Sequence, residues 1–104
     1  MEITDAIYDL SVGMPNTEKF GLTSQMTRCA VSIPSNIAEG SSRRSEKDYF
    51  RFCEIALGSA FELETQLLIV AKRNWVEMSK VNFILEQLTI EQRMLVGFMD
   101  KLII

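Results

Sequence analysis

Residues 45–73 read SEKDYFRFCEIALGSAFELETQLLIVAKR, and apolar residues recur along this stretch at steps of three and four. That spacing is the period of an α-helix. Ser45, with Asp48 three residues later, has the pattern of a helix N-terminus, where a serine oxygen accepts a backbone hydrogen bond. The apolar positions are Tyr49, Phe52, Cys53, Ala56, Leu57, Ala60, Phe61, Leu63, Leu67, Leu68 and Val70. They cover about half of the circumference, which is wider than the single seam of a coiled coil.

Turn-forming residues divide the rest of the chain. They lie at Gly13 to Thr17, at Gly40 to Ser42 and at Asn74. The predicted helices run from Thr4 to Val12, from Thr17 or Leu22 to Glu39, from Ser45 to Arg73, and from Val76 to Ile103. Short connections favour antiparallel neighbours. The sequence therefore predicts an all-α fold, an antiparallel up-down four-helix bundle with a short first helix, in a single domain over residues 1–104.

The second helix contains a proline inside its apolar pattern. Its core stripe is Leu22, Met26, Cys29, Ala30, Ile33 and Ile37. Pro34 lacks a backbone donor and clashes with the preceding turn, so we expect a kink near Ala30 to Ile33. A break into two helices is the alternative. Because Ile37 and Ala38 continue the periodicity beyond the proline, the sequence favours the kink.

The fourth helix has apolar residues on two faces. Its main stripe is Val81, Ile84, Leu85, Leu88, Leu95, Met99 and Leu102. Phe83, Ile90 and Met94 lie on the back of the helix. A short first helix also leaves part of the bundle groove uncovered. We therefore expect a homo-oligomer whose interface includes Phe83, Ile90 and Met94, because large exposed apolar patches are uncommon on monomers. A monomer with a somewhat apolar surface is the alternative.

Composition argues against most kinds of catalytic site. The 104 residues have a hydrophobic fraction of 47%, a net charge of −3, two cysteines and no histidine. Common Cys/His zinc sites and histidine-dependent catalysis are therefore excluded. We expect no enzyme activity, no metal site and no cofactor. The apolar runs are too short to span a bilayer, and no secretory signal is visible, so we expect a cytoplasmic protein that does not enter the membrane.

Glu64 is an unexpected residue within the apolar arc of the third helix. Helical spacing places it among Leu57, Ala60, Phe61 and Leu68. A buried carboxylate needs a partner, and Asn36, beside the stripe of the second helix, offers two donors. We expect Glu64 and Asn36 to be structural polar residues, while an acid or base with a raised pKa is the alternative.

The two cysteines, Cys29 and Cys53, lie at similar distances from the Gly40 turn, so an antiparallel hairpin could set them level. Because both lie on core stripes, we expect two reduced thiols that act as small apolar side chains.

Basic residues are concentrated at one place, the start of the third helix. Arg43, Arg44, Lys47 and Arg51 form this basic cluster. Arg44, Lys47 and Arg51 project together at steps of three and four, although acidic residues are interspersed among them. The cluster is the candidate contact for RNA or DNA phosphates, and a solvated helix start is the alternative.

Three segments of the chain resemble a known family. They are GLTSQ at residues 21–25, VSIPSNIAEG at 31–40 followed by Arg43, Arg44 and Ser45, and ALGSAFELETQL at 56–67. In these segments the chain is similar to the 23S rRNA intervening-sequence proteins. The resemblance implies a four-helix bundle, commonly a ring of five subunits, and relatedness to the accessory variability determinant of diversity-generating retroelements. That relative binds nucleic acid and a reverse transcriptase.

The resemblance and the residue patterns together predict a function without catalytic chemistry. We expect a homopentameric helical scaffold that contacts RNA or DNA through the basic cluster, with a reverse transcriptase as a candidate protein partner. The alternative is a protein-protein interaction module with no nucleic-acid role.

Overall fold

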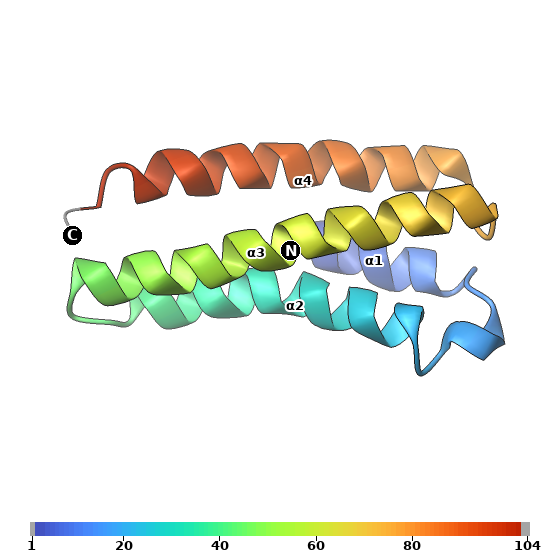
Figure 1. Cartoon of the computed structure of the whole chain (residues 1–104), viewed down its shortest axis with the longest axis horizontal. Coiled ribbons are helices and arrows are strands. Elements are labelled where there is room, and N and C mark those ends of the chain that lie inside the picture. The colour runs from blue at the N-terminus through green and yellow to red at the C-terminus, as the bar shows by residue number, and fades with distance from the viewer. Residues whose placement is uncertain (1, 103–104) are drawn as a thin grey trace.

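The computed structural model describes residues 2–102, in which every regular element is a helix and no strand occurs. The elements are α1 (Glu2–Ser11), the 3-10 helix η1 (Asn16–Glu18), α2 (Leu22–Ser41), α3 (Glu46–Arg73) and α4 (Met78–Met99). Figure 1 shows α2, α3 and α4 lying along the long axis of the molecule, with the chain reversing direction at each connection. The predicted all-α four-helix bundle is confirmed.

Local hydrogen bonds fix both ends of α3. The backbone N–H of Asp48 donates to Ser45 Oγ over 3.1 Å, so Ser45 caps the start as the sequence predicts. At the other end, Asn74 adopts the left-handed conformation with φ 56°, and its N–H donates to the carbonyl of Ala71. Asparagine tolerates this conformation better than most residues. The predicted end at Arg73 is therefore correct.

Pro34 lies within α2 without breaking it, so the alternative of two separate helices is wrong. The kink stays a prediction. Because proline has no N–H, the carbonyl of Ala30, four residues earlier, lacks its usual helical partner. Thr4 of α1 donates its hydroxyl to this carbonyl over 3.3 Å. The proline thus frees an acceptor that helps to hold α1 against α2.

Two predicted helix ends differ from the structure. Thr17 belongs to η1, so α2 has the later of its two predicted starts, Leu22. Helix α4 begins at Met78 rather than Val76, because Val76 packs against the core from the connecting loop. It ends at Met99, and the predicted end at Ile103 lies outside the described residues.

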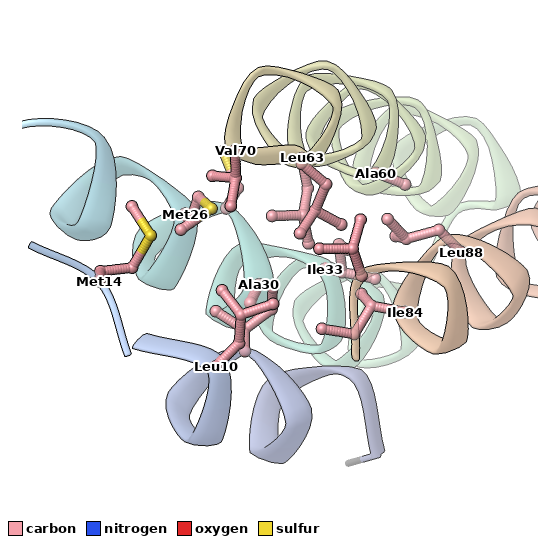
Figure 2. Close-up of a cluster of buried hydrophobic side chains, with 14 residues drawn as sticks. Leu10, Met14, Met26, Ala30, Ile33, Ala60, Leu63, Val70, Ile84 and Leu88 are labelled. Atoms are coloured by element: carbon pink, nitrogen blue, oxygen red, sulfur yellow. The ribbon is translucent and has the colours of Figure 1, made fainter. Parts of the chain in front are cut away.

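The core is divided along the bundle into a large and a small part. The large cluster takes side chains from all four helices, as Figure 2 shows for Leu10, Ile33, Leu63 and Ile84 among others. The small cluster consists of Cys53, Ala56, Leu95 and Met99. This division follows from the ten residues of α1, which span about 15 Å. Helix α1 packs against α2 and α4 over only part of their length.

The predicted core stripes are largely confirmed. The buried members are Met26, Cys29, Ala30 and Ile33 in α2, Cys53, Ala56, Ala60, Leu63, Leu67 and Val70 in α3, and Val81, Ile84, Leu88, Leu95 and Met99 in α4. Phe61 and Leu68, which the sequence places in the arc of α3, are about half exposed instead. The arc is wider than the surface that α2 and α4 cover.

The register between α2 and α3 separates the two cysteines. Ser32 Oγ lies 2.9 Å from Ser59 Oγ. Cys29, one turn before Ser32, is therefore level with Glu62, whereas Cys53 lies on the turn side of Ser59. The hairpin therefore does not set the cysteines level, as it could have done from their spacing alone. Both thiols are free and buried, in different core clusters.

Candidate functional site

The basic cluster is organised around one aromatic ring. Arg43, Arg44, Lys47 and Arg51 are exposed at the connection between α2 and α3 and on the first turns of α3. The guanidinium carbons of Arg43 and Arg51 lie 4.9 Å and 5.0 Å from the centroid of the Phe52 ring. A guanidinium is attracted to the face of an aromatic ring and keeps its N–H groups available to other acceptors. Phe52 therefore helps to order two of the four cations.

Gly40 allows this ring to lie where it does. A Cβ atom at Gly40 would come within 2.8 Å of Tyr49 Cδ1 and 2.9 Å of Phe52 Cβ. The backbone of α2 thus approaches α3 at a distance that only glycine permits. Any side chain at this position would displace the ring that Arg43 and Arg51 contact.

Acidic groups limit the positive charge of the cluster. Arg43 forms an ion pair with Glu39, with 3.0 Å between Nη2 and Oε2. Asp48 and Glu54 line the same surface depression as Lys47 and Arg51, with a volume of about 480 Å³. The site can attract phosphate groups, but the attraction is weaker than four unopposed cations would give.

Phe83, Ile90 and Met94 form an exposed apolar stripe along α4. Their side chains are 44%, 52% and 64% exposed. Phe83 lies beside α1, where it lines a depression with Ala6. Ile90 and Met94 line a different depression, beside the start of α1, so the structure brings these two together at one place and Phe83 at another.

One end of the stripe meets an open groove between α2 and α4. Ile33 and Pro34 line this groove from α2, and Ile90 and Met94 line it from α4. Its volume is about 270 Å³. We call it the α2–α4 groove. Glu2, Ile3 and Thr4, at the start of α1, also line it.

Glu64 and Asn36 are not partners of each other. Gln92 of α4 donates its amide Nε2 to Glu64 Oε1 over 2.8 Å. Asn36 Nδ2 donates within α2, to the carbonyl and the hydroxyl oxygen of Ser32 at 2.8 Å and 2.9 Å. The expected pairing is wrong because Glu64 lies on the side of α3 that faces α4. Their assignment as structural polar residues stays a prediction.

Gln66 is a buried polar residue that the sequence reading missed. It is only 5% exposed, and its Oε1 is buried without a hydrogen-bond partner among the described residues. Its Nε2 lies 3.4 Å from Glu62 Oε2. The sequence does indicate that Gln66 is buried, because it follows Leu63 by three residues and precedes Val70 by four, on the core stripe of α3.

Cys29 lies beside Gln66 and is not a good nucleophile. Burial, together with a hydrogen bond to Glu62 as a smaller cause, raises the pKa of its thiol to about 11. Burial also raises the pKa of Cys53. Because the thiolate is the reactive form, both cysteines are poorly reactive near neutral pH.

Metal binding and membrane crossing need features that the described residues do not provide. Among residues 2–102, no three Cys, Asp or Glu side chains lie close enough together to hold a metal ion. The same residues include no helix long and apolar enough to cross a membrane.

Comparison with known proteins places this geometry in a family. The model of the 23S rRNA-intervening sequence protein family matches residues 1–97, which include the basic cluster and the α2–α4 groove. The chain belongs to this family. A search of curated proteins finds no match.

One solved structure supports the fold of this intervening-sequence protein. It is the crystal structure of a protein with unknown function from the S23 ribosomal protein family of Bacteroides thetaiotaomicron VPI-5482. The two chains superpose with a TM-score of 0.74 at 23% sequence identity, over 93% of this chain and 97% of the other. At this identity the similarity shows the fold alone.

Proposed function

We propose that this intervening-sequence protein is a non-catalytic scaffold that works as a homo-oligomer, with five subunits as the family resemblance implies. The observation that carries the proposal is the exposed stripe of Phe83, Ile90 and Met94 on α4. The core contains other residues of the same helix, and residues 2–102 leave this stripe exposed. Subunit contact removes such side chains from water, and each contributes about 1.5–3 kcal/mol when fully buried.

Light scattering at micromolar concentration tests self-association. We expect a mass several times that of one chain, and we expect Phe83→Glu to dissociate the assembly because it places a charge in the interface. Val96→Glu is the matched control, since Val96 is also 44% exposed but points to another side of α4. A monomeric wild type contradicts the proposal.

A second role, contact with RNA or DNA, is supported by the basic cluster. Arg43 and Arg51 are held against one ring, and neither needs to leave it to donate to a phosphate oxygen. In a homo-oligomer the cluster is repeated once per subunit, so that weak contacts act together. Repetition offsets the net charge of −3 per chain.

Fluorescence polarisation with labelled RNA and DNA at low salt tests this role. We expect weak binding with little base preference, because phosphate contacts carry no sequence information. Arg43→Glu combined with Arg44→Glu is expected to abolish binding while the assembly mass stays unchanged. No binding by the wild type, or equal binding by both proteins, favours the alternative of a protein-protein module, for which a reverse transcriptase is the partner that the resemblance implies.

A further inference from the structure

The surface depression on the first turns of α3 is lined by three kinds of chemical group. Its volume is about 480 Å³, and its lining residues are Lys47, Asp48, Phe50, Arg51 and Glu54. Lys47, Phe50, Arg51 and Glu54 follow one another at helical spacing, so they lie on one face of α3. We call this place the Phe50 depression. It brings together two cations, two carboxylates and one aromatic side chain.

Phe50 is the aromatic residue that a ligand in the depression would meet. It is partly buried, because it packs against the small core cluster while it also lines the depression. The core therefore holds this side chain in place. The neighbouring ring of Phe52 is already contacted by the guanidinium groups of Arg43 and Arg51. A flat ligand that enters the depression therefore stacks on Phe50 rather than on Phe52.

The carboxylates distinguish this depression from a simple phosphate site. Asp48 and Glu54 balance Lys47 and Arg51, and no two of these four side chains form an ion pair with each other. The whole segment of residues 39–54 is also balanced, with four cations and four carboxylates. The attraction of phosphate groups alone is therefore weak at this surface. A ligand gains more when it also offers N–H donors to the carboxylates.

We propose that the Phe50 depression receives an unpaired base of single-stranded RNA or DNA, with the adjoining phosphates on Lys47 and Arg51. The inference rests on the proposed contact with nucleic acid and names the form of nucleic acid that fits. Every base has a flat face that stacks on an aromatic ring, whatever the sequence. Every base also has an N–H donor on its pairing edge, and a carboxylate accepts from it when no second strand does.

A duplex lacks the groups that this depression can use. Its bases are stacked on one another and their pairing edges are occupied, so it offers mainly phosphates. A surface that contacts phosphates alone favours the duplex, which carries one negative charge per about 1.7 Å of helix axis, compared with about 3.4 Å for each of its strands. A preference for the single strand therefore opposes charge density and has to come from Phe50 and the carboxylates.

Fluorescence polarisation tests the proposal with one labelled RNA of mixed sequence, used both unpaired and annealed to its complement at the same low salt. We expect the wild type to bind the unpaired strand more tightly. Phe50→Leu keeps an apolar side chain against the core and changes no charge. We expect it to weaken binding of the single strand about tenfold, within the range that stacking of one base contributes, and to leave duplex binding unchanged.

Phe20→Leu is the matched control for the loss of an aromatic ring. Phe20 is 89% exposed and has Lys19 Nζ 5.5 Å from its ring centroid, but it lies before the start of α2 and outside the depression. We expect this variant to bind both forms of the RNA like the wild type. Circular dichroism checks that each variant keeps the helicity of the wild type.

Glu54→Gln tests the carboxylates at an exposed position where the fold is not at risk. Removal of one negative charge is expected to strengthen duplex binding. The single strand is expected to gain less, because an amide oxygen is a weaker acceptor than a carboxylate. The ratio of single-strand affinity to duplex affinity therefore falls in this variant.

Equal or tighter binding of the duplex by the wild type overturns the proposal but leaves the contact with nucleic acid standing. An unchanged affinity ratio in folded Phe50→Leu or in Glu54→Gln also overturns it. Release of the labelled strand by an equal concentration of a nucleoside monophosphate would assign the depression to free nucleotides and has the same consequence. No binding of either form removes the proposed contact with nucleic acid itself.

Discussion

At the scale of single residues, Glu64 connects two helices through one hydrogen bond. Glu64→Ala leaves the amide of Gln92 without its partner, so we expect a loss of about 1–3 kcal/mol in the free energy of unfolding. Glu64→Gln keeps an acceptor oxygen and is expected to lose less. Urea unfolding followed by circular dichroism measures both. Equal midpoints for Glu64→Ala and the wild type would show that the bond contributes nothing to stability.

Cys29 makes stability depend on alkaline pH. The thiol has a pKa of about 11 in the folded protein and an ordinary value of 9.0 when exposed. Between these values the unfolded chain binds fewer protons than the native chain, so the free energy of unfolding falls as pH rises. The contribution is complete below pH 9.0.

Comparison of the wild type with Cys29→Ala isolates this effect, because the other titrating groups are shared. We expect the wild type to lose more stability than the variant between about pH 8 and about pH 10.5. Denaturant unfolding at the two pH values gives the difference. Parallel losses would mean that Cys29 titrates normally in the folded state.

The polar residues also show which contacts could not be predicted from the sequence. Spacing on α3 placed Glu64 within the apolar arc correctly, but its partner is 28 positions away on α4. That pairing depends on the register between two helices, which periodicity within each helix does not determine. Gln66 is different, because its place on the core stripe is visible in the sequence.

At the scale of helices, Pro34 and Thr4 act as a pair that docks α1. Thr4→Val removes the hydrogen bond to the carbonyl of Ala30 and is expected to cost about 1 kcal/mol. In a Pro34→Ala background the restored backbone N–H satisfies the same carbonyl. We therefore expect Thr4→Val to cost less there.

A double-mutant cycle on Thr4 and Pro34 measures this coupling from four unfolding curves. The matched control is Thr4→Ser, which keeps the hydroxyl donor and is expected to retain the coupling. The same cost of Thr4→Val in both backgrounds would show that the two positions act independently.

Helix existence and most helix ends were predictable because their causes are local. Ser45 begins α3 through its side chain, and Asn74 ends α3 through its backbone conformation. The start of α4 was not predictable from local sequence, because contact with the core holds Val76 in the loop. In the sequence, the apolar side chain of Val76 fits the helical pattern of α4. Tertiary packing decided that boundary.

At the scale of the whole molecule, nucleic-acid binding by an acidic chain depends on salt. We expect the logarithm of the affinity to fall linearly with the logarithm of salt concentration, because neutralised phosphates release counterions. Each phosphate contact contributes about 0.7–0.9 to the slope. Polarisation at a series of salt concentrations measures it. A flat profile would show that the basic cluster does not contact phosphates.

The two candidate surfaces differ in how far the sequence predicted them. The basic cluster is contiguous along the chain, so its residues were found directly, although the shared ring of Phe52 was not. Ile90 and Met94 were correctly placed off the core stripe of α4. That they border a groove with Pro34 depends on how α1, α2 and α4 pack together, which is a property of the assembled bundle.

The division of the core into two clusters means that the molecule has two ends of unequal local stability. The small cluster under the basic cluster buries fewer side chains, so its amide protons are expected to exchange with solvent sooner. Each cluster holds one cysteine, Cys53 in the small and Cys29 in the large. A thiol reagent therefore labels Cys53 when only the turn end opens, and Cys29 when the α1 end opens. The labelling rates of the two cysteines therefore report local opening at the two ends of the bundle separately. Slower labelling of Cys53 in the presence of RNA would locate a ligand at the turn end.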